Sequence, residues 1–314
     1  MDKVCGVYYT IPDSDKKIIQ GGLRTKYSNI SDFKNMEMPL VTIITVVLNR
    51  ANQIERAIKS VLGQTYGNIE LIIIDGGSTD GTMDIIKKYE DSVDYYLSEC
   101  DGGIYYAMNK GLSLARGEYI GILNSDDWLT DDAVEISVDA LVNSGCDYTG
   151  AHEYKVDTAG NIVSLYHARP FDEVAFLGLP PCPHGSMFIS NKSYNAIGYY
   201  DTKYSSASDY KMQCLLIKNK SLKGVVVDKY LRYFSVDGMT GSATGIRNSL
   251  LQVKKIVMEF FENDIPNMEV ESLVRFLLMD DRRGYVLKSV SQLLDRELFT
   301  MKQERVLVEM LKNI

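Results

Sequence analysis

The chain has 314 residues, of which 45% are hydrophobic and 24% are charged, and these values are typical of a folded globular protein rather than a disordered one. Its 34 Lys and Arg residues stand against 42 Asp and Glu residues, so the net charge of -8 provides no general attraction to nucleic acid or to an anionic membrane. Five widely spaced cysteines and an amino terminus without a basic, then apolar, leader argue against a disulfide framework and predict a cytoplasmic location.

The first half of the chain alternates between apolar strands and amphipathic helices. Residues 1–38 are polar and turn-rich, and we expect them to form an extension that packs on or near the main domain. A β-branched run at residues 40–47 then predicts a strand that is buried on both faces. The same reasoning predicts, in order, a helix from residue 52, a strand at 69–74, a helix at 82–89, a strand at 94–97, a helix at 105–115 and a strand at 119–123.

This alternation is typical of βαβ units around a parallel sheet. Ligands of such sheets bind beyond the carboxyl ends of the strands. In this sequence polar and acidic residues follow three of the strands, at 49–50, 75–78 and 124–127. The sequence therefore predicts a ligand site at one edge of the sheet.

The second half of the chain has a more mixed pattern. Its apolar runs predict extended stretches at 148–156, 162–167, 184–189 and 225–234, and a helix at 208–217. The Gly- and Ser-rich residues 236–245 are typical of a mobile loop. Apolar residues at helical spacing predict helices after residue 245.

Two adjacent carboxylates follow the strand at 119–123, in Asn124-Ser125-Asp126-Asp127. Like charges a few ångströms apart raise each other's pKa, and a hard divalent cation that also contacts phosphate oxygens would neutralise them. The alternative is a solvated turn in which Asp127 caps the next helix. The two other polar strand ends nearby favour the cation site.

The turn at residues 75–82 combines glycines with Ser, Thr and Asp. Glycine permits a sharp turn or a close approach to a ligand. The segment has neither the G-x-G-x-x-G spacing of a dinucleotide site nor the spacing of a P-loop. A ligand role for Asp75 rests on its position at the strand end, and a tight strand-to-helix turn is the alternative.

Asp209 and His184 are the remaining candidates for chemistry. Asp209 lies in the first turn of the predicted helix 208–217, where a carboxylate stabilises the helix dipole and, near the crevice, is also what a general base would be. His184 precedes a predicted strand and follows a proline-rich loop, a place compatible with ligand or metal contact. A surface or core packing role is the alternative for His184.

Together these motifs resemble glycosyltransferase family 2, whose members have the GT-A fold. The resemblance rests on four segments in order: residues 39–49 (PLVTIITVVLN), 60–65 (SVLGQT), 70–81 (ELIIIDGGSTDG) and 117–127 (GEYIGILNSDD). Residues 101–105 (DGGIY) and 107–111 (AMNKG) are similar to the branch found in bacterial capsule, O-antigen and exopolysaccharide clusters. The resemblance is strong over residues 39–145 and continues more weakly to about residue 240.

The resemblance implies an α/β fold of the GT-A type, with a Rossmann-like, mainly parallel central sheet flanked by helices and a C-terminal helical extension. It divides the chain into an N-terminal extension (1–38), a GT-A domain (39–245) and a C-terminal helical region (246–314). Within the GT-A domain, residues 39–145 would form the nucleotide-sugar half and residues 146–245 the acceptor half.

The resemblance also implies an inverting, metal-dependent glycosyltransferase of bacterial surface polysaccharide synthesis. It would transfer a sugar from a nucleotide diphosphate sugar, most simply a UDP-sugar, to a hydroxyl of a glycan or lipid-linked acceptor. Asp209 would be the catalytic base, and Asp126, Asp127 and His184 would hold Mn²⁺ or Mg²⁺. The residues that would bind the donor are Thr45, Asn49, Arg50, Asp75, Asn109, Asn124, Ser125 and Asp126.

Three departures from the family pattern keep other functions open. Asn124 stands in place of the first Asp of D-x-D, and Gly76 and Tyr106 stand where acids are common. A catalytically degenerate GT-A scaffold or carbohydrate-binding subunit is therefore the alternative. A sugar-1-phosphate nucleotidyltransferase is disfavoured, because residues 45–50 lack the Gly-rich loop with Arg and Lys expected after its first strand.

The C-terminal helices leave three roles open: a cap on the core, a homodimer face, or peripheral contact with the inner face of the plasma membrane. Arg282-Arg283 beside apolar residues 276–279 permits membrane contact, but Asp280-Asp281 opposes it. A cap or dimer face is therefore favoured. The expected partners are a nucleotide-sugar donor and a glycan or lipid-linked acceptor, without nucleic acid.

Overall fold

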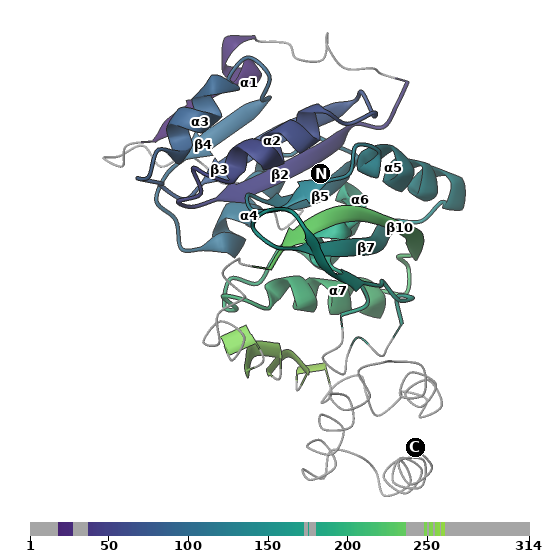
Figure 1. Ribbon diagram of the computed structural model, residues 1–314. Helices are drawn as coiled ribbons and strands as arrows, with labels where there is room; N and C mark the ends of the chain where they lie inside the picture. Colours follow the sequence, from purple (N-terminus) through teal and green to yellow (C-terminus); the bar gives the residue numbers. More distant parts are fainter. Residues whose placement is uncertain are drawn as a thin grey trace, which may run out of the picture.

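A computed structural model of the chain describes residues 18–27, 37–172, 175, 180–236, 248–249, 251–253, 255–257 and 259–260. Within these residues one ten-stranded sheet lies between two layers of helices (Figure 1). The strand order is β1-β4-β3-β2-β5-β9-β7-β10-β6, and β8 pairs with β7 outside this path. The predicted α/β class is confirmed.

The strands are β1 (Ile19–Gly21), β2 (Val41–Val47), β3 (Ile69–Asp75), β4 (Tyr95–Ser98), β5 (Tyr119–Asn124), β6 (Trp128–Leu129), β7 (Tyr148–Val156), β8 (Ile162–Tyr166), β9 (Phe188–Ser190) and β10 (Gly224–Ser235). The α-helices are α1 (Leu23–Lys26), α2 (Ile54–Leu62), α3 (Thr82–Lys88), α4 (Ile104–Leu114), α5 (Ala133–Ser144), α6 (Asn191–Ile197) and α7 (Ser208–Lys218), and η3 (His184–Ser186) is a short 3-10 helix.

Strands β4, β3, β2 and β5 run parallel and bring their carboxyl ends to the same edge of the sheet. Val47 at the end of β2 lies opposite Asp75, and Val46 lies opposite Asn124. Every residue of β2 is buried, as its continuous β-branched sequence predicts. The parallel sheet and its shared polar edge are therefore confirmed.

The side chains of β2 alternate between two cores. Ile43 and Val47 pack in the core that includes residues of α2, α3 and α5. Ile44 and Val46 pack in the core that includes residues of α4, α6 and α7. Gly111 lets α4 lie close to β2, because a Cβ at this position would come within 2.3 Å of the Ile44 side chain.

The strand expected at 184–189 is shorter in the structure. His184–Ser186 form η3, and only Phe188–Ser190 pair as β9. The Ser186 hydroxyl donates to the carbonyl oxygen of Pro183 and accepts from the backbone N–H of Ala151, so a side chain takes over the hydrogen bonds of a continuing strand. The structure also contains β6, α5 and α6, which the sequence analysis did not predict.

Residues 18–27 pack on the outer edge of the sheet. β1 pairs antiparallel with β4, and the backbone N–H groups of Leu23 and Arg24 donate to carbonyls of the chain before β4. The Arg24 guanidinium pairs with the buried carboxylate of Glu70 and donates to the Leu114 carbonyl oxygen at 2.8 Å. The rest of the predicted extension, residues 1–17 and 28–36, lies outside the described residues.

The described residues between 248 and 260 are helical and lie against α7. Lys211 pairs with Glu259 at 2.7 Å, and Gln252 accepts the backbone N–H of Ser206 at 3.0 Å. The predicted loop residues 237–245 and helices beyond 260 lie outside the described residues, together with the dimer and membrane roles that depend on them. No helix in the described part combines the length and apolar character needed to cross a membrane.

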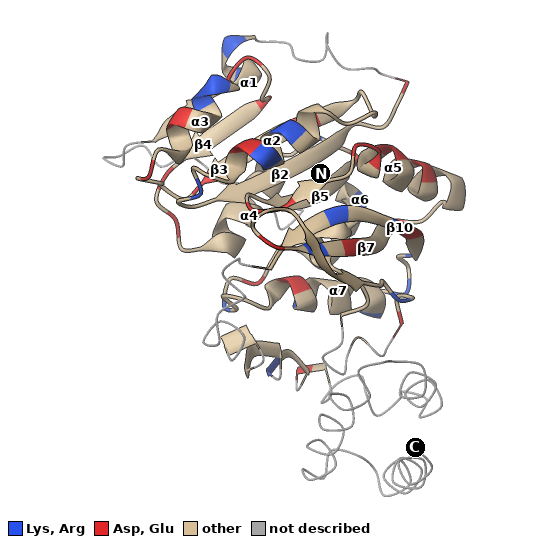
Figure 2. Ribbon diagram, viewed as in Figure 1, with Lys and Arg blue, Asp and Glu red and all other residues tan. Residues whose placement is uncertain are grey.

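The charged residues on the described ribbon are mixed in sign. In the view of Figure 2, Lys and Arg are interspersed with Asp and Glu on the helices and strands, and no face in that view is uniformly basic.

Replacement of Arg24 by Met should lower the free energy of unfolding by about 3 kcal/mol, because it leaves the buried Glu70 carboxylate without its cation. Urea denaturation would measure the loss. Lys26→Met on the same short helix is the matched control, since Lys26 pairs with Asp91 at an exposed position and should change the midpoint little. Equal losses in the two variants would contradict a structural role for the buried pair.

Candidate functional site

A cavity of about 240 Å³ opens at the carboxyl ends of β2 and β5. Its walls come from the end of β2, the start of α4, the turn after β5 and the end of β10. The lining residues are Val46, Val47, Leu48, Arg50, Gly76, Asp101, Gly103, Ile104, Ala107, Asn124, Ser125, Asp126 and Phe234. The cavity lies at the edge of the sheet where the sequence predicted a ligand site.

Asp126 is the one predicted metal ligand that lines this cavity. Burial raises the pKa of its carboxyl group, and the charge of Asp127 raises it further, against the opposing effect of Arg50 and Arg232. Both raising effects disfavour the carboxylate, so a cation beside Asp126 would stabilise its charged form.

Asn124 and Ser125 line the cavity next to Asp126. The Oδ1 atom of Asn124 is buried and accepts no hydrogen bond from the described residues. A buried acceptor without a donor is unfavourable by about 1–3 kcal/mol. This oxygen is therefore suited to a cation or to a hydroxyl of a bound ligand.

Asp127 is buried behind the cavity and is held by β10. Its Oδ2 pairs with Arg232, and its Oδ1 accepts the backbone N–H of Ser235 at 3.0 Å. Arg232 also binds Glu153 of β7 at 2.9 Å. Burial alone would lower the pKa of Arg232, but the two carboxylates raise it above its ordinary value. Both carboxylate oxygens of Asp127 thus bind the protein, and Asp127 does not line the cavity.

His184 is also engaged elsewhere. Its Nε2 hydrogen-bonds the Tyr200 hydroxyl at 2.6 Å, and its ring packs edge-on against the Tyr200 ring. Burial lowers the pKa of His184 to about 4. In the described part of the chain, no three His, Cys, Asp or Glu side chains are grouped to hold a metal ion. Of the three predicted ligands among the described residues, Asp126 is the one that lines the cavity.

Asn49 and Arg50 follow β2 as predicted, but only Arg50 lines the cavity. Asn49 has a left-handed φ of 52°, which asparagine tolerates better than most residues. Its Oδ1 accepts the backbone N–H of Thr79 at 2.9 Å, and its own N–H donates to the Ser78 hydroxyl at 2.7 Å. Asn49 therefore joins the turns that follow β2 and β3.

Asp75 is fully engaged in the turn after β3. It accepts the backbone N–H groups of Gly77 at 3.1 Å and Ser78 at 3.0 Å, and the hydroxyl of Ser98 at 2.6 Å. Asp75 is buried and does not line the cavity. The structure therefore supports the tight-turn interpretation that the sequence left open beside the ligand role.

Thr45 and Asn109 do not reach the cavity. Thr45 is fully buried within β2. The Asn109 amide donates to the Tyr200 carbonyl oxygen at 2.9 Å and accepts the Tyr200 backbone N–H at 3.0 Å. Because both ends of the amide bind backbone, Asn109 ties α4 to the chain before α7.

Asp209 lies in the first turn of α7, as the sequence predicted. Its Oδ1 accepts the phenol hydroxyl of Tyr105 at 2.8 Å. Tyr105 lies in the first turn of α4, between Ile104 and Ala107, which line the cavity. Through this turn of helix, Asp209 is connected to the wall of the cavity.

Asp101, Tyr105 and Arg232 are site residues that the sequence analysis did not assign. Asp101 lines the cavity and accepts the backbone N–H of Gly103 at 2.9 Å, which fixes the start of α4. Asp101 and Tyr105 lie in a segment that carries the family resemblance, so the motif was a signal for them. Arg232 had none, since 105 residues separate it from Asp127.

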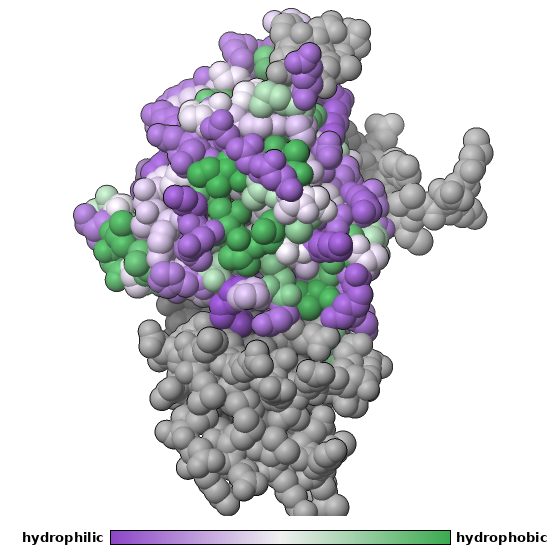
Figure 3. All heavy atoms as spheres, turned by 90° about the vertical axis from the view of Figure 1, so that its right-hand side faces the viewer, coloured by the Kyte–Doolittle hydropathy of each residue, from purple (hydrophilic) through white to green (hydrophobic). Residues whose placement is uncertain are grey.

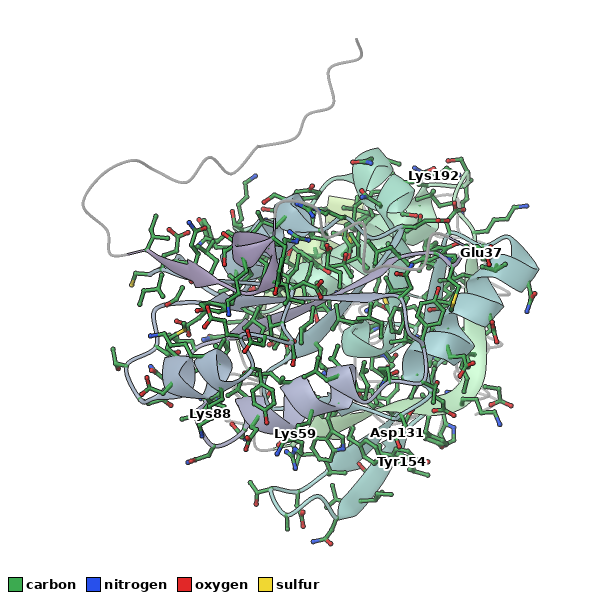
Figure 4. All side chains as sticks on the ribbon, turned by 90° about the horizontal axis from the view of Figure 1, so that it is seen from above. Glu37, Lys59, Lys88, Asp131, Tyr154 and Lys192 are labelled. Atoms are coloured by element: carbon green, nitrogen blue, oxygen red, sulfur yellow. The ribbon has the colours of Figure 1, made fainter. Side chains whose placement is uncertain are left out.

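A second hollow of about 900 Å³ lies at the opposite, amino-terminal ends of β2 and β5. Residues such as Leu40, Gly117 and Val142 line it, with Glu37 and Lys192, which lie at the same end of the molecule in Figure 4. In Figure 3 the right-hand side of Figure 1 faces the viewer, and hydrophobic residues gather in the middle of that described face. Parallel sheets bind ligands at the other ends of their strands, so we do not assign this hollow to the site.

The buried, neutral state of His184 should make the protein less stable as the pH falls from about 6.5 to about 4. The pKa of His184 is 6.5 in the unfolded chain and about 4 in the fold, so only the unfolded chain takes up its proton in this window. The effect is at most about 1.4 kcal/mol per pH unit. Urea titrations of His184→Gln should show a smaller loss of stability over this window than the unchanged protein. His167→Gln, at an exposed position, is the control, and an unchanged slope in His184→Gln would refute the assignment.

The sequence matches known proteins over the segment that builds the cavity. Residues 42–197 match the model of glycosyl transferase family 2. The chain is 29% identical over 260 residues to chondroitin synthase of Escherichia coli, a match that covers 73% of this chain and 37% of that protein. It is 34% identical over 174 residues to the uncharacterized glycosyltransferase Rv1514c of Mycobacterium tuberculosis, covering 54% of this chain and 66% of that protein. The chain thus spans less than two thirds of either relative.

Solved structures share the fold at low sequence identity. Residues 1–349 of S. aureus TarS, solved in complex with UDP-GlcNAc, superpose with a TM-score of 0.60 at 18% identity, covering 79% of this chain and 76% of TarS 1–349. The mannosyltransferase PcManGT from Pyrobaculum calidifontis, in complex with GDP-Man and Mn²⁺, gives a TM-score of 0.52 at 16% identity over 82% of this chain and 86% of that one. At these identities the likeness concerns the fold alone.

The family match and the fold agree with the strand-end motifs that first suggested the resemblance. The match covers all of the parallel strands whose carboxyl ends form the cavity, from β2 to β5. From this agreement we conclude that the chain belongs to glycosyltransferase family 2 and has the GT-A fold.

Proposed function

We propose that this chain transfers a sugar from a nucleotide diphosphate sugar to a hydroxyl of a glycan or lipid-linked acceptor, with inversion at the anomeric carbon and with the help of a divalent cation. The observation that carries the proposal is the cavity at the carboxyl ends of β2 and β5, with the carboxylate of Asp126 in its wall and the Asp209 carboxylate tied to the helix beside it. This arrangement offers an anion for a cation and a separate base for an acceptor.

The residues present fit a divalent cation. Asp126 supplies a carboxylate whose charged form burial disfavours, and Asn124 supplies a buried amide oxygen without a hydrogen bond among the described residues. Carboxylate and amide oxygens are ligands that Mg²⁺ and Mn²⁺ prefer. When bound, the cation would neutralise negative charge on the diphosphate that leaves.

Residues of the chain would bind the phosphate, exclude water and remove the proton from the acceptor. Arg50 lines the cavity, and its guanidinium would pair with a phosphate oxygen of the donor. The apolar side chains of Val46, Ile104 and Phe234 exclude water, which competes with the acceptor. Asp209 would take the proton from the acceptor hydroxyl as that oxygen attacks the anomeric carbon from the face opposite the diphosphate. One such displacement inverts the configuration at that carbon.

The comparisons support the choice of donor and acceptor classes. TarS was solved with UDP-GlcNAc and PcManGT with GDP-Man and Mn²⁺, so nucleotide-sugar donors and a divalent cation occur on this fold. Relatives of the chain are named chondroitin synthase and hyaluronan synthase, which makes a bacterial polysaccharide the acceptor class to test first. A UDP-sugar is the donor we propose.

Asp126→Ala should abolish metal-dependent binding of the donor. We would measure thermal unfolding with UDP-, GDP-, CMP- and dTDP-sugars, each with Mn²⁺ and with EDTA. A donor at 100 times its Kd stabilises the native state by about 2.7 kcal/mol, and EDTA should remove most of that gain. Asp131→Ala is the matched control, because Asp131 is an exposed aspartate near the same turn.

The same screen separates the proposal from its alternative. Chondroitin and hyaluronan oligosaccharides and simple hexosides would be offered as acceptors. If a donor binds but no nucleoside diphosphate is released with any of them, the degenerate scaffold is favoured. An Asp126→Ala variant that keeps the metal-dependent shift would remove Asp126 from the cation site.

Asp209→Asn should lower kcat for transfer by about 10² to 10⁴, the range that general base catalysis contributes, and leave the donor Kd unchanged. The amide keeps the shape of the side chain and its acceptor oxygen for Tyr105, so folding should be preserved. Release of nucleoside diphosphate from the donor found in the screen would measure kcat. A rate close to that of the unchanged protein would exclude Asp209 as the base.

A further inference from the structure

Tyr105 occupies an unusual place between the two sides of the proposed site. It lies in the first turn of α4, whose residues Ile104 and Ala107 line the cavity at the strand ends. Its own side chain is buried and reaches Asp209 of α7. A single turn of helix thus carries both the wall of the cavity and a contact to Asp209.

The phenol of Tyr105 can act only as a hydrogen-bond donor to Asp209. The hydroxyl lies 2.8 Å from Oδ1 of Asp209. Burial raises the pKa of Tyr105 well above its ordinary value of 10, and the charge of Asp209 raises it further. The hydroxyl therefore keeps its proton at neutral pH, and one oxygen of the Asp209 carboxylate is committed to it.

The Tyr105 ring is held firmly enough to fix this contact. It stacks on the ring of Tyr200, with 5.7 Å between the ring centroids and an angle of 26° between the planes. One turn further along α4, Asn109 makes two hydrogen bonds to the backbone of the same Tyr200. The hydroxyl of Tyr200 in turn bonds His184 at 2.6 Å and contacts the hydroxyl of Tyr194 at 3.2 Å. These contacts leave the phenol of Tyr105 little freedom.

We propose that Tyr105 is a positioning residue for the base. By occupying Oδ1 of Asp209 it directs Oδ2 toward the acceptor hydroxyl, and it couples the orientation of the carboxylate to the helix that forms the donor cavity. The inference rests on the proposed function, since it assigns Asp209 the role of base. A residue that only stabilised the fold would affect unfolding without a selective effect on kcat.

Tyr105→Phe tests this directly, because it removes one hydroxyl and leaves the ring on Tyr200. We expect kcat for transfer to fall by about 10- to 100-fold, the size of effect that misorientation of a reacting group produces, while the KM and Kd for the donor stay unchanged. Donor-induced thermal stabilisation verifies that the variant is folded and binds.

Tyr89→Phe is the matched control for the chemical change. Tyr89 also donates to a carboxylate at 2.8 Å, that of Glu55, at the far end of α3 and away from the cavity. This variant should keep the kcat of the unchanged protein. Equal losses of kcat in the two tyrosine variants would overturn the inference.

A double-mutant cycle with Asp209→Asn shows whether Tyr105 acts through the base. In the Asp209→Asn background, removal of the Tyr105 hydroxyl should have no further effect on the residual rate, because the base it positions is absent. Additive losses, or a normal kcat in Tyr105→Phe, would overturn the inference and leave the proposed function intact. Absence of transfer by the unchanged protein with every donor would overturn both. Should Tyr105→Phe not fold, Asp209→Glu is measured instead. Its longer side chain keeps a carboxylate but moves it away from the Tyr105 hydroxyl, so kcat should fall by at least about 10-fold with the donor Kd unchanged, and a normal kcat overturns the inference.

Discussion

The buried guanidinium of Arg232 holds the two halves of the site together. It lies in β10 and pairs with Asp127, in the turn between β5 and β6, and with Glu153 of β7, so two strands and this turn are joined at one charge. Gly185 makes room for it, because a Cβ there would come within 2.3 Å of the guanidinium carbon. Buried charges are tolerated only when paired. Arg232 neutralises Asp127. Of the two adjacent carboxylates, Asp126 is therefore the one that lines the cavity.

Helix α4 has a comparable role between the donor and acceptor sides. Its start is fixed by Asp101, its first turn lines the cavity, and Tyr105 and Asn109, four residues apart on one face, contact α7 and the chain before it. The close approach at Gly111 holds this helix against β2. The helix whose first turn lines the proposed donor cavity is thus also the helix that makes the hydrogen bond to the proposed base.

The parallel sheet and its polar edge could be predicted because they depend on local patterns. β2 has an uninterrupted β-branched sequence, and strand ends meet at one edge wherever neighbouring strands are parallel. Which of two adjacent aspartates faces the cavity could not be predicted, because the answer depends on an arginine 105 residues away. The contact of Asn109 could not be predicted for a similar reason, since nothing in its motif shows that both ends of its amide bond to the backbone of Tyr200, 91 residues away.

The short strand β1 has a consequence for the behaviour of the protein at high concentration. β4 would otherwise be the edge of the sheet, and three of its four residues pair with β1. An uncovered strand edge presents free N–H and C=O groups that can pair with another molecule. By covering β4 with a strand of only three residues, a segment with no part in the proposed chemistry leaves a shorter edge on which another copy of this chain could pair.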